Sequence, residues 1–117
     1  MKDDPNLWLE DIIEASDEIS KYTNNVAQDE FVRDSMRYNA TIRMISVIGD
    51  AITNLEKGFK EKYPQVPWQQ IKDMRNILIH EYWQTDLDQV YLSATKEVPE
   101  LRHLVQEILD RLTSSKS

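Results

Sequence analysis

The segment YNATIRMISVIGDAITNLEKGF, residues 38–59, decides the fold. It contains no proline, and its apolar residues recur every three or four positions, as on one face of an α-helix. On a helical wheel these apolar positions cover an arc of roughly 220°, about twice the stripe of an ordinary amphipathic helix. One neighbouring layer cannot cover so wide an arc. The segment is therefore either the central helix of a bundle or a helix that gives one side to a homodimer interface.

The flanking sequence also favours helices, because it has only two Gly and four Pro and no sustained strand alternation. We expect helices over residues 5–22, from about 29–35 to 57, over 67–81, from near Asp86, and from Pro99 onward. Pro64 and Pro67 end the second helix, and Pro67 suits the first turn of the third. The sequence predicts an all-α fold, a small bundle of about five helices. We expect a single domain over residues 1–113 and a frayed tail at 114–117.

The composition narrows the classes of function. No apolar run approaches the roughly 20 residues of a membrane span, and the acidic start does not resemble a signal peptide. We therefore expect a soluble, cytoplasmic protein. With no Cys and only two His, the chain offers no thiolate site and no paired histidines, so we expect no metal and no cofactor. A net charge of -7 argues against a broad nucleic-acid-binding face but allows a small basic cleft.

One polar constellation stands within an apolar helical run. The segment DMRNILIHEYW, residues 73–83, carries Arg75, Asn76, His80 and Tyr82 among Ile and Leu. Arg75 and His80 are five residues apart, so on an ideal helix their side chains diverge by about 140°. They can converge only through the long Arg75 side chain, through a helix that ends at His80, or through a second copy of the chain.

These residues allow a structural and a functional interpretation. In the structural one, Arg75 pairs with Asp73 or Glu81, His80 lies near a helix C-terminus, and Tyr82 packs. In the functional one, the imidazole moves a proton, the guanidinium holds a phosphoryl oxygen, and the Asn side chain orients either of them. The second set of roles would suit metal-free cleavage of RNA that uses its own 2′-hydroxyl as the nucleophile.

A wider stretch around this constellation resembles the HepT-like branch of the HEPN domains. It comprises YPQVPWQQIKDMRNILIHEYWQTDLDQVY (residues 63–91), with IGDAITNL upstream and VPEL downstream. Arg75 and His80 match the R-x4-H core of that family, Asn76 directly follows the Arg, and Tyr82 completes R-x4-H-x-Y. The bare R-x4-H pattern is weak, but it is specific within P-x-x-P-W…M-R-N…H-x-Y. The resemblance covers most of the chain from the second helix to the last.

The resemblance implies a helical bundle that dimerises, with the Arg and His of both subunits lining one cleft. It further implies a metal-independent endoribonuclease toxin that acts on RNA, with Arg75, Asn76 and His80 as catalytic residues. Its cognate minimal nucleotidyltransferase antitoxin would transfer AMP from ATP to Tyr82 and so block the cleft. The alternative is a non-catalytic module that partners such a nucleotidyltransferase. A purely structural helical dimer would leave Asn76, His80 and Tyr82 unexplained.

Other aromatic and charged residues have two interpretations each. Trp68 and Trp83 either stack on bases or, as we expect beside Pro and apolar helices, belong to the core. His103 is expected on the surface or in a structural role. Four lysines either contact phosphate near the cleft or, as we expect, form a solvated charged face: Lys57, Lys60, Lys62 and Lys72.

Overall fold

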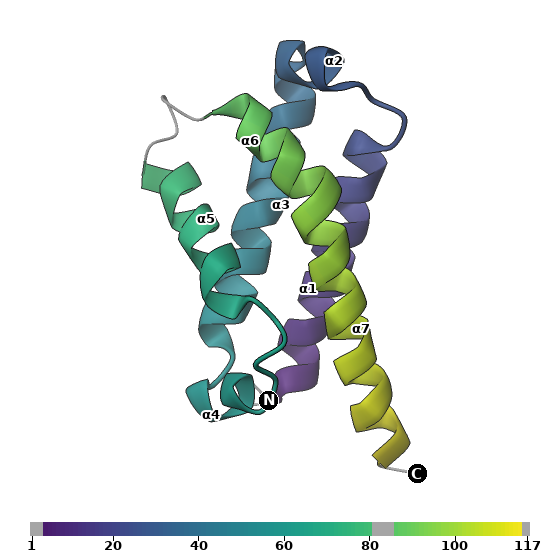
Figure 1. Ribbon diagram of the computed structural model, residues 1–117, viewed down its shortest axis with the longest axis vertical. Helices are drawn as coiled ribbons and strands as arrows, with labels where there is room; N and C mark the ends of the chain where they lie inside the picture. The colour runs from purple at the N-terminus through teal and green to yellow at the C-terminus, as the bar shows by residue number, and fades with distance from the viewer. Residues whose placement is uncertain (1–3, 81–85, 116–117) are drawn as a thin grey trace.

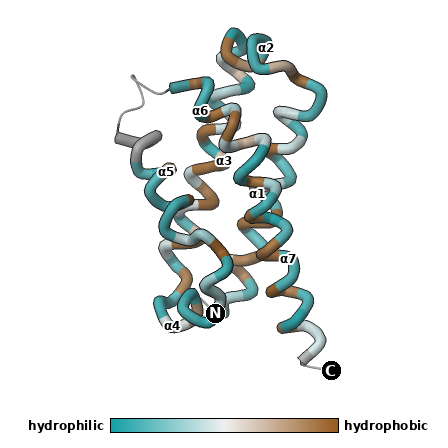
Figure 2. Tube along the Cα trace, viewed as in Figure 1, coloured by the Kyte–Doolittle hydropathy of each residue, from teal (hydrophilic) through white to brown (hydrophobic). Residues whose placement is uncertain are grey.

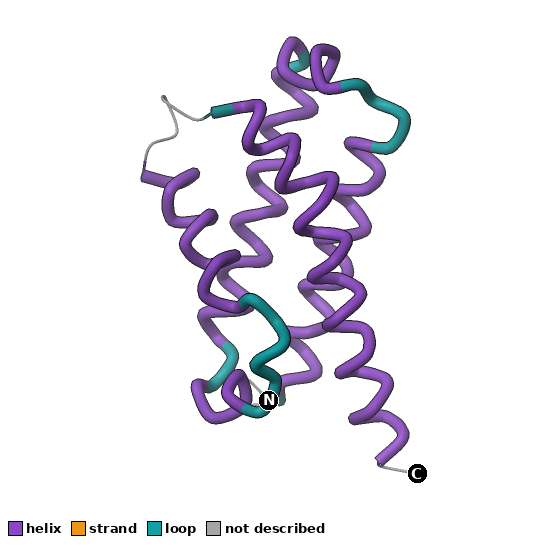
Figure 3. Tube along the Cα trace, viewed as in Figure 1, coloured by secondary structure: helices purple, strands orange, loops and turns teal. Residues whose placement is uncertain are grey.

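The computed structural model describes residues 4–80 and 86–115, apart from the side chains of 77–80 and 115. Every regular element in these ranges is a helix (Figure 3), which confirms the all-α prediction. The elements are α1 (Pro5–Thr23), α2 (Gln28–Arg33), α3 (Ser35–Asn54), α4 (Lys57–Glu61), α5 (Trp68–His80), α6 (Leu87–Leu92), the π-helical segment η2 (Ser93–Glu97) and α7 (Val98–Ser115). No helix in the described ranges is long and apolar enough to cross a bilayer.

Aspartate side chains cap the first turns of α1, α3 and α6. The side chain of Asp4 accepts a hydrogen bond from the Asn6 N–H at 2.9 Å, and Asp86 caps α6 in the same way. Asp34 accepts from the Arg37 N–H at 3.1 Å and has an extended backbone, with φ −107° and ψ 94°. The helix expected to start between residues 29 and 35 is α3, which starts at Ser35 and ends at Asn54, three residues before the expected end; α2 is a separate short helix that was not expected.

The central element is α3, which lies between α1 and α5 and also contacts α2 and α6 (Figure 1). Most of its wide apolar arc is covered by these helices of the same chain. A strip of the arc formed by Ala40, Met44 and Val47 stays half-exposed. The buried residues of α3 are Thr41, Ile42, Ile45, Ile48, Gly49, Ala51 and Ile52.

The other long helical run is a rod formed by α6, η2 and α7, whose α7 end packs on α1. Figure 2 shows apolar stretches recurring along α1, α3 and α7 between hydrophilic ones. The core joins these helices through fully buried residues such as Leu9 and Ile12 of α1 and Leu101 and Val105 of α7.

The last helix, expected from Pro99 onward, is α7, which starts one residue earlier at Val98 and follows η2 without a break. The rod runs continuously from Leu87 to Ser115 through the π-helical segment η2. Proline has no N–H to donate to the carbonyl four residues earlier, and its ring crowds that carbonyl. The Val98 N–H instead bonds the carbonyl of Ser93, five residues back, and this wider turn lets the helix pass Pro99.

Candidate active site

Trp68 and Ile71 anchor α5, the helix that carries the predicted site, to the rest of the bundle. Trp68 is 8% exposed, and its indole Nε1 donates to the carbonyls of Lys60 at 3.2 Å and Tyr63 at 3.1 Å. Ile71 is 1% exposed. These contacts confirm that Trp68 belongs to the core, whereas Trp83 lies outside the described residues. The start of α5 is therefore fixed against α3 and α4.

Arg75 crosses from α5 to α3. Its Nη2 forms an ion pair with Asp50 Oδ1, and its Nη1 donates to Asn76 Oδ1 at 2.8 Å. The Arg75 side chain is 25% exposed, whereas that of Asp50 is 58% exposed. The guanidinium is thus held on two of its nitrogens, and it lies at the surface of the seam between α3 and α5.

Gly49 makes this crossing possible. A Cβ atom at Gly49 would lie 2.4 Å from Arg75 Cγ and 2.6 Å from Arg75 Cβ, far inside van der Waals contact. The aliphatic part of Arg75 therefore runs directly over the backbone of α3. Together, Gly49 and Asp50 form what we call the arginine seat.

Asn76 orients Arg75, as its position next to the arginine suggested. Because a guanidinium offers only donors, it is the amide oxygen of Asn76 that faces it. Arg75 pairs with a carboxylate, as the structural interpretation expected, but the partner is Asp50 and not Asp73, which instead accepts from Gln69 Nε2 at 2.7 Å. Asp73 points along its own helix and away from the α3 contact.

The remaining predicted residues fall at the end of α5. His80 is the last described residue of α5, but its side chain lies outside the described part of the chain, as do Glu81 and Tyr82. The convergence of Arg75 with His80 therefore stays a prediction. His103, on α7, has a 75% exposed side chain 3.9 Å from Glu107, which confirms its expected surface position.

Three of the four predicted lysines meet in one hollow beside the start of α5. Lys57, Lys60 and Lys72 line a hollow of about 510 Å³, while Lys62 lines a different one next to Trp8. Lys60 is half-buried and donates to the carbonyl of Ile52 at 3.1 Å. Burial lowers the pKa of Lys60 below its ordinary value, and the nearby charge of Lys72 lowers it further.

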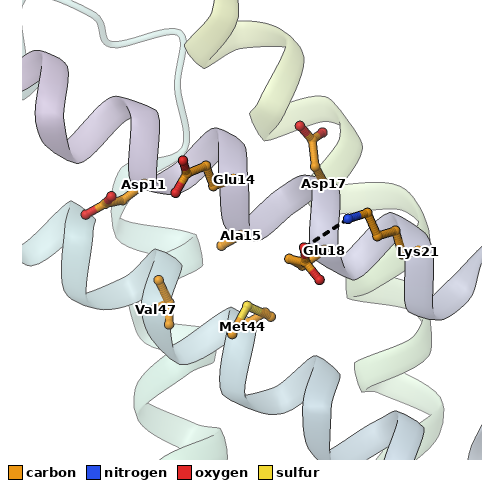
Figure 4. A pocket seen from close by; sticks show the side chains of 8 residues that line it. All are labelled: Asp11, Glu14, Ala15, Asp17, Glu18, Lys21, Met44 and Val47. Atoms are coloured by element: carbon orange, nitrogen blue, oxygen red, sulfur yellow. Dashed lines mark hydrogen bonds and ion pairs between the residues drawn. The ribbon is translucent and has the colours of Figure 1, made fainter.

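A second hollow, of about 450 Å³, lies between α1 and α3 and has the opposite charge (Figure 4). Four carboxylates and Lys21 surround a floor that includes Met44 and Val47. The bond from Lys21 lowers the pKa of Glu18, and that from Tyr22 adds to the effect. Such a groove repels a phosphate backbone. The carboxylates are Asp11, Glu14, Asp17 and Glu18. These four carboxylates are not arranged to hold a metal ion together. No group of three or more His, Cys, Asp or Glu side chains in the described residues is arranged in that way.

Asp50 and Gly49 are the residues at the site that sequence reasoning did not single out. Both belong to residues 38–59, whose apolar periodicity predicted a helix but no site. A signal was present, because a glycine in a helix interior costs about 1 kcal/mol and so indicates a close approach by another group. That group is Arg75, which follows Asp50 by 25 residues, and its identity was not available from spacing.

Comparisons with known proteins agree on one family. A family model described as Ribonuclease HepT-like matches residues 12–108. A protein of Methanocaldococcus jannaschii named "Gamma-glutamylcyclotransferase and putative RNase" is 34% identical over 117 residues, and the chain spans 53% of its length. A "Putative RNase" of Caldanaerobacter subterraneus subsp. tengcongensis is 36% identical, over 92% of this chain and 96% of that protein. A "Probable ribonuclease HepT" of Thermococcus cleftensis is 32% identical, over 87% and 93% respectively. No solved structure matches the chain.

Proposed function

Since the chain belongs to the HepT-like ribonuclease family, we propose that it is a metal-independent endoribonuclease with Arg75, Asn76 and His80 at its catalytic centre. The observation that carries this proposal is the held guanidinium of Arg75. Two of its five N–H donors are engaged, by Asp50 and Asn76, and each Nη keeps one more. A cation fixed in this way is prepared to meet a phosphoryl oxygen without reorganising.

The proposed reaction uses the RNA as its own nucleophile. His80 takes the proton of the 2′-hydroxyl, the 2′-oxygen attacks the adjacent phosphorus, and the bond to the 5′-oxygen breaks. His80 then returns the proton to the departing 5′-oxygen, leaving a 2′,3′-cyclic phosphate and a 5′-hydroxyl. Arg75 balances the charge that builds on the phosphoryl oxygens. The scheme requires no metal, because the nucleophile and the leaving group both belong to the substrate.

We propose that two copies of the chain complete the cleft. The five-residue offset turns Arg75 and His80 apart on an ideal helix, so a second copy offers one way to bring an arginine and a histidine together.

We further propose that the protein is a cytoplasmic toxin whose antitoxin is a cognate minimal nucleotidyltransferase. The antitoxin would transfer AMP from ATP to the hydroxyl of Tyr82 and release pyrophosphate. An added phosphate charge two residues beyond His80 would repel the RNA phosphate, and the nucleotide would fill the cleft mouth. A protein that binds the nucleotidyltransferase but never cleaves RNA would instead be the non-catalytic partner module.

Cleavage of single-stranded RNA by the purified chain tests the catalytic proposal. Arg75→Ala and His80→Ala should each lower the rate on the order of a hundredfold, as for other charge-stabilising and acid–base groups. A chelator should leave the wild-type rate unchanged. Normal cleavage by His80→Ala, or loss of cleavage with chelator, contradicts the mechanism.

Incubation with the cognate nucleotidyltransferase and ATP tests the switch. The intact mass of the wild type should rise by one AMP, and its RNA cleavage should stop. Tyr82→Phe should keep cleaving and stay unmodified. Equal modification of Tyr82→Phe, or a fully modified wild type that still cleaves, rules out Tyr82 as the switch.

A further inference from the structure

The hollow beside the start of α5 concentrates positive charge in an acidic protein. Its charged lining consists of the ammonium groups of Lys57, Lys60 and Lys72 and the exposed carboxylate of Glu61. Where α3 meets α1, it borders the acidic groove of Figure 4 instead. With a net charge of -7 on the whole chain, the hollow is a local exception to the overall charge. We call it the lysine hollow.

The lysines of this hollow are held close together without ion pairs. Lys60 is fixed to the carbonyl of Ile52 at 3.1 Å, so its ammonium is not free to swing into solvent. None of Lys57, Lys60 and Lys72 forms an ion pair with any residue in the described ranges. Burial and the charge of Lys72 both disfavour the charged form of Lys60. The isolated chain thus bears an unfavourable interaction that a bound anion would relieve.

Residues of both α3 and α5 line the lysine hollow, and the same two helices form the contact at the arginine seat. Lys72 precedes Arg75 by three residues on α5, so the two side chains are neighbours on the helix surface, about 4.5 Å apart along its axis. On the α3 side, Ile52 belongs to the hollow and follows Gly49 of the seat by three residues, on the same face of the helix. A single strand of RNA that places one phosphate at Arg75 can therefore reach the hollow with a neighbouring phosphate.

We propose that the lysine hollow binds a backbone phosphate of single-stranded RNA next to the one that is cleaved. This assignment rests on the proposed ribonuclease function. Lys60 and Lys72 are the main contacts, because both are half-buried and lie close enough for their charges to interact. Phosphate contacts of this kind position the strand without reading its sequence.

The salt dependence of RNA binding tests this proposal. The probe is a short 2′-O-methyl oligoribonucleotide, which cannot be cleaved, and binding is followed by fluorescence anisotropy over a range of NaCl concentrations. Each lost phosphate contact should reduce the slope of log K against log [salt] by about 0.7 for a single strand. Lys60→Gln and Lys72→Gln should each show that reduction, whereas Lys60→Arg should keep the wild-type slope.

Lys62→Gln is the matched control, since Lys62 is an exposed lysine nearby in the sequence that lines the hollow next to Trp8 and not the lysine hollow. It should leave the slope unchanged. An equal reduction for Lys62→Gln would mean that RNA responds to the overall positive charge and not to a specific contact in the hollow, which contradicts the proposal. Unchanged slopes for Lys60→Gln and Lys72→Gln would also overturn it.

The same variants separate this proposal from the ribonuclease function. If the wild type does not cleave ordinary RNA but the slopes fall as expected, the hollow stands and the ribonuclease function fails. If RNA is cleaved and the slopes do not change, only the hollow fails. If the protein cleaves RNA, Lys60→Gln and Lys72→Gln should raise KM, because each removes a contact to a phosphate that does not react. They should change kcat little, because neither lysine contacts the bond that breaks.

Discussion

At Gly49 a single missing side chain determines where Arg75 can lie. The arginine crosses the backbone of α3 at a distance that no Cβ atom could tolerate. Its guanidinium then reaches Asp50, the next residue on α3. The position of the proposed catalytic cation is therefore set by two adjacent residues on a different helix.

Gly49→Ala should destabilise the protein and impair RNA cleavage. Overpacking of a well-packed contact costs about 1–3 kcal/mol, which exceeds the roughly 1 kcal/mol gained from the better helix propensity of alanine. Gly58→Ala is the matched control, because nothing lies within 4 Å of a Cβ there, and it should be neutral or stabilising. Urea unfolding measures both. If Gly49→Ala stabilises as much as Gly58→Ala, Arg75 does not occupy the seat.

Asp50→Ala should lower kcat on the order of tenfold to a hundredfold, because a misplaced catalytic group loses the transition-state interaction. KM should not rise, because removing the Asp50 carboxylate also removes a negative charge that repels the RNA phosphates. Asp50→Glu should recover most of the rate by keeping the carboxylate.

Asp17→Ala is the control, because it removes an exposed ion pair that does not involve Arg75. Asp17 binds Arg102 Nε at 2.6 Å and has a 50% exposed side chain, similar to the 58% of Asp50. Steady-state kinetics on all three variants decide the matter. Equal losses for Asp17→Ala and Asp50→Ala would show a general effect on folding, not the positioning of Arg75.

At the scale of helices, periodicity predicted most elements, and side-chain chemistry decided their ends. The helix expected over residues 5–22 is α1, and the one expected over 67–81 is α5, which is described up to His80. The expected start of the second helix, between residues 29 and 35, left open whether α2 was part of it, and the Asp34 side chain decides this by capping α3. Periodicity reports which face is apolar, and it does not detect a local hydrogen bond that competes with helix continuation.

The contact between α3 and α5 lay beyond sequence reasoning for a different reason. Arg75 and Asp50 are brought together by tertiary packing, and the nearer carboxylate Asp73 was the better guess from spacing alone. Spacing along one helix describes neighbours on that helix. A partner on another helix depends on the angle and register of packing, which the pattern does not fix.

Trp68→Phe should lower stability without weakening RNA binding. The substitution removes an indole N–H that bonds the carbonyls of Lys60 and Tyr63, at a cost of roughly 1–2 kcal/mol. Thermal unfolding and anisotropy with the 2′-O-methyl oligoribonucleotide measure the two effects separately. A large loss of RNA affinity at unchanged stability would indicate that Trp68 stacks on a base and is not a core anchor.

At the scale of the whole molecule, charge and apolar surface are distributed unevenly around α3. The lysine hollow and the arginine seat lie toward α5, and the acidic groove lies toward α1. RNA should therefore approach along the seam of α3 and α5. Two expectations from the sequence stay predictions. They are the single domain over residues 1–113 and the cytoplasmic location.

The protein should form a homodimer in solution. Light scattering at micromolar concentration should give twice the chain mass of 13.8 kDa. A clean monomer that retains full RNA cleavage would rule out a cleft shared by two copies.

The chemical identity of the RNA ends tests the central claim most directly. Mass spectrometry of the fragments from a defined single-stranded RNA, incubated with the wild type and a chelator, should find 2′,3′-cyclic phosphate and 5′-hydroxyl ends. A single 2′-deoxy substitution at the cleaved nucleotide should block that cut, because it removes the nucleophile. Fragments with 3′-hydroxyl and 5′-phosphate ends, or cleavage that survives the 2′-deoxy substitution, would show that water is the nucleophile and contradict the mechanism.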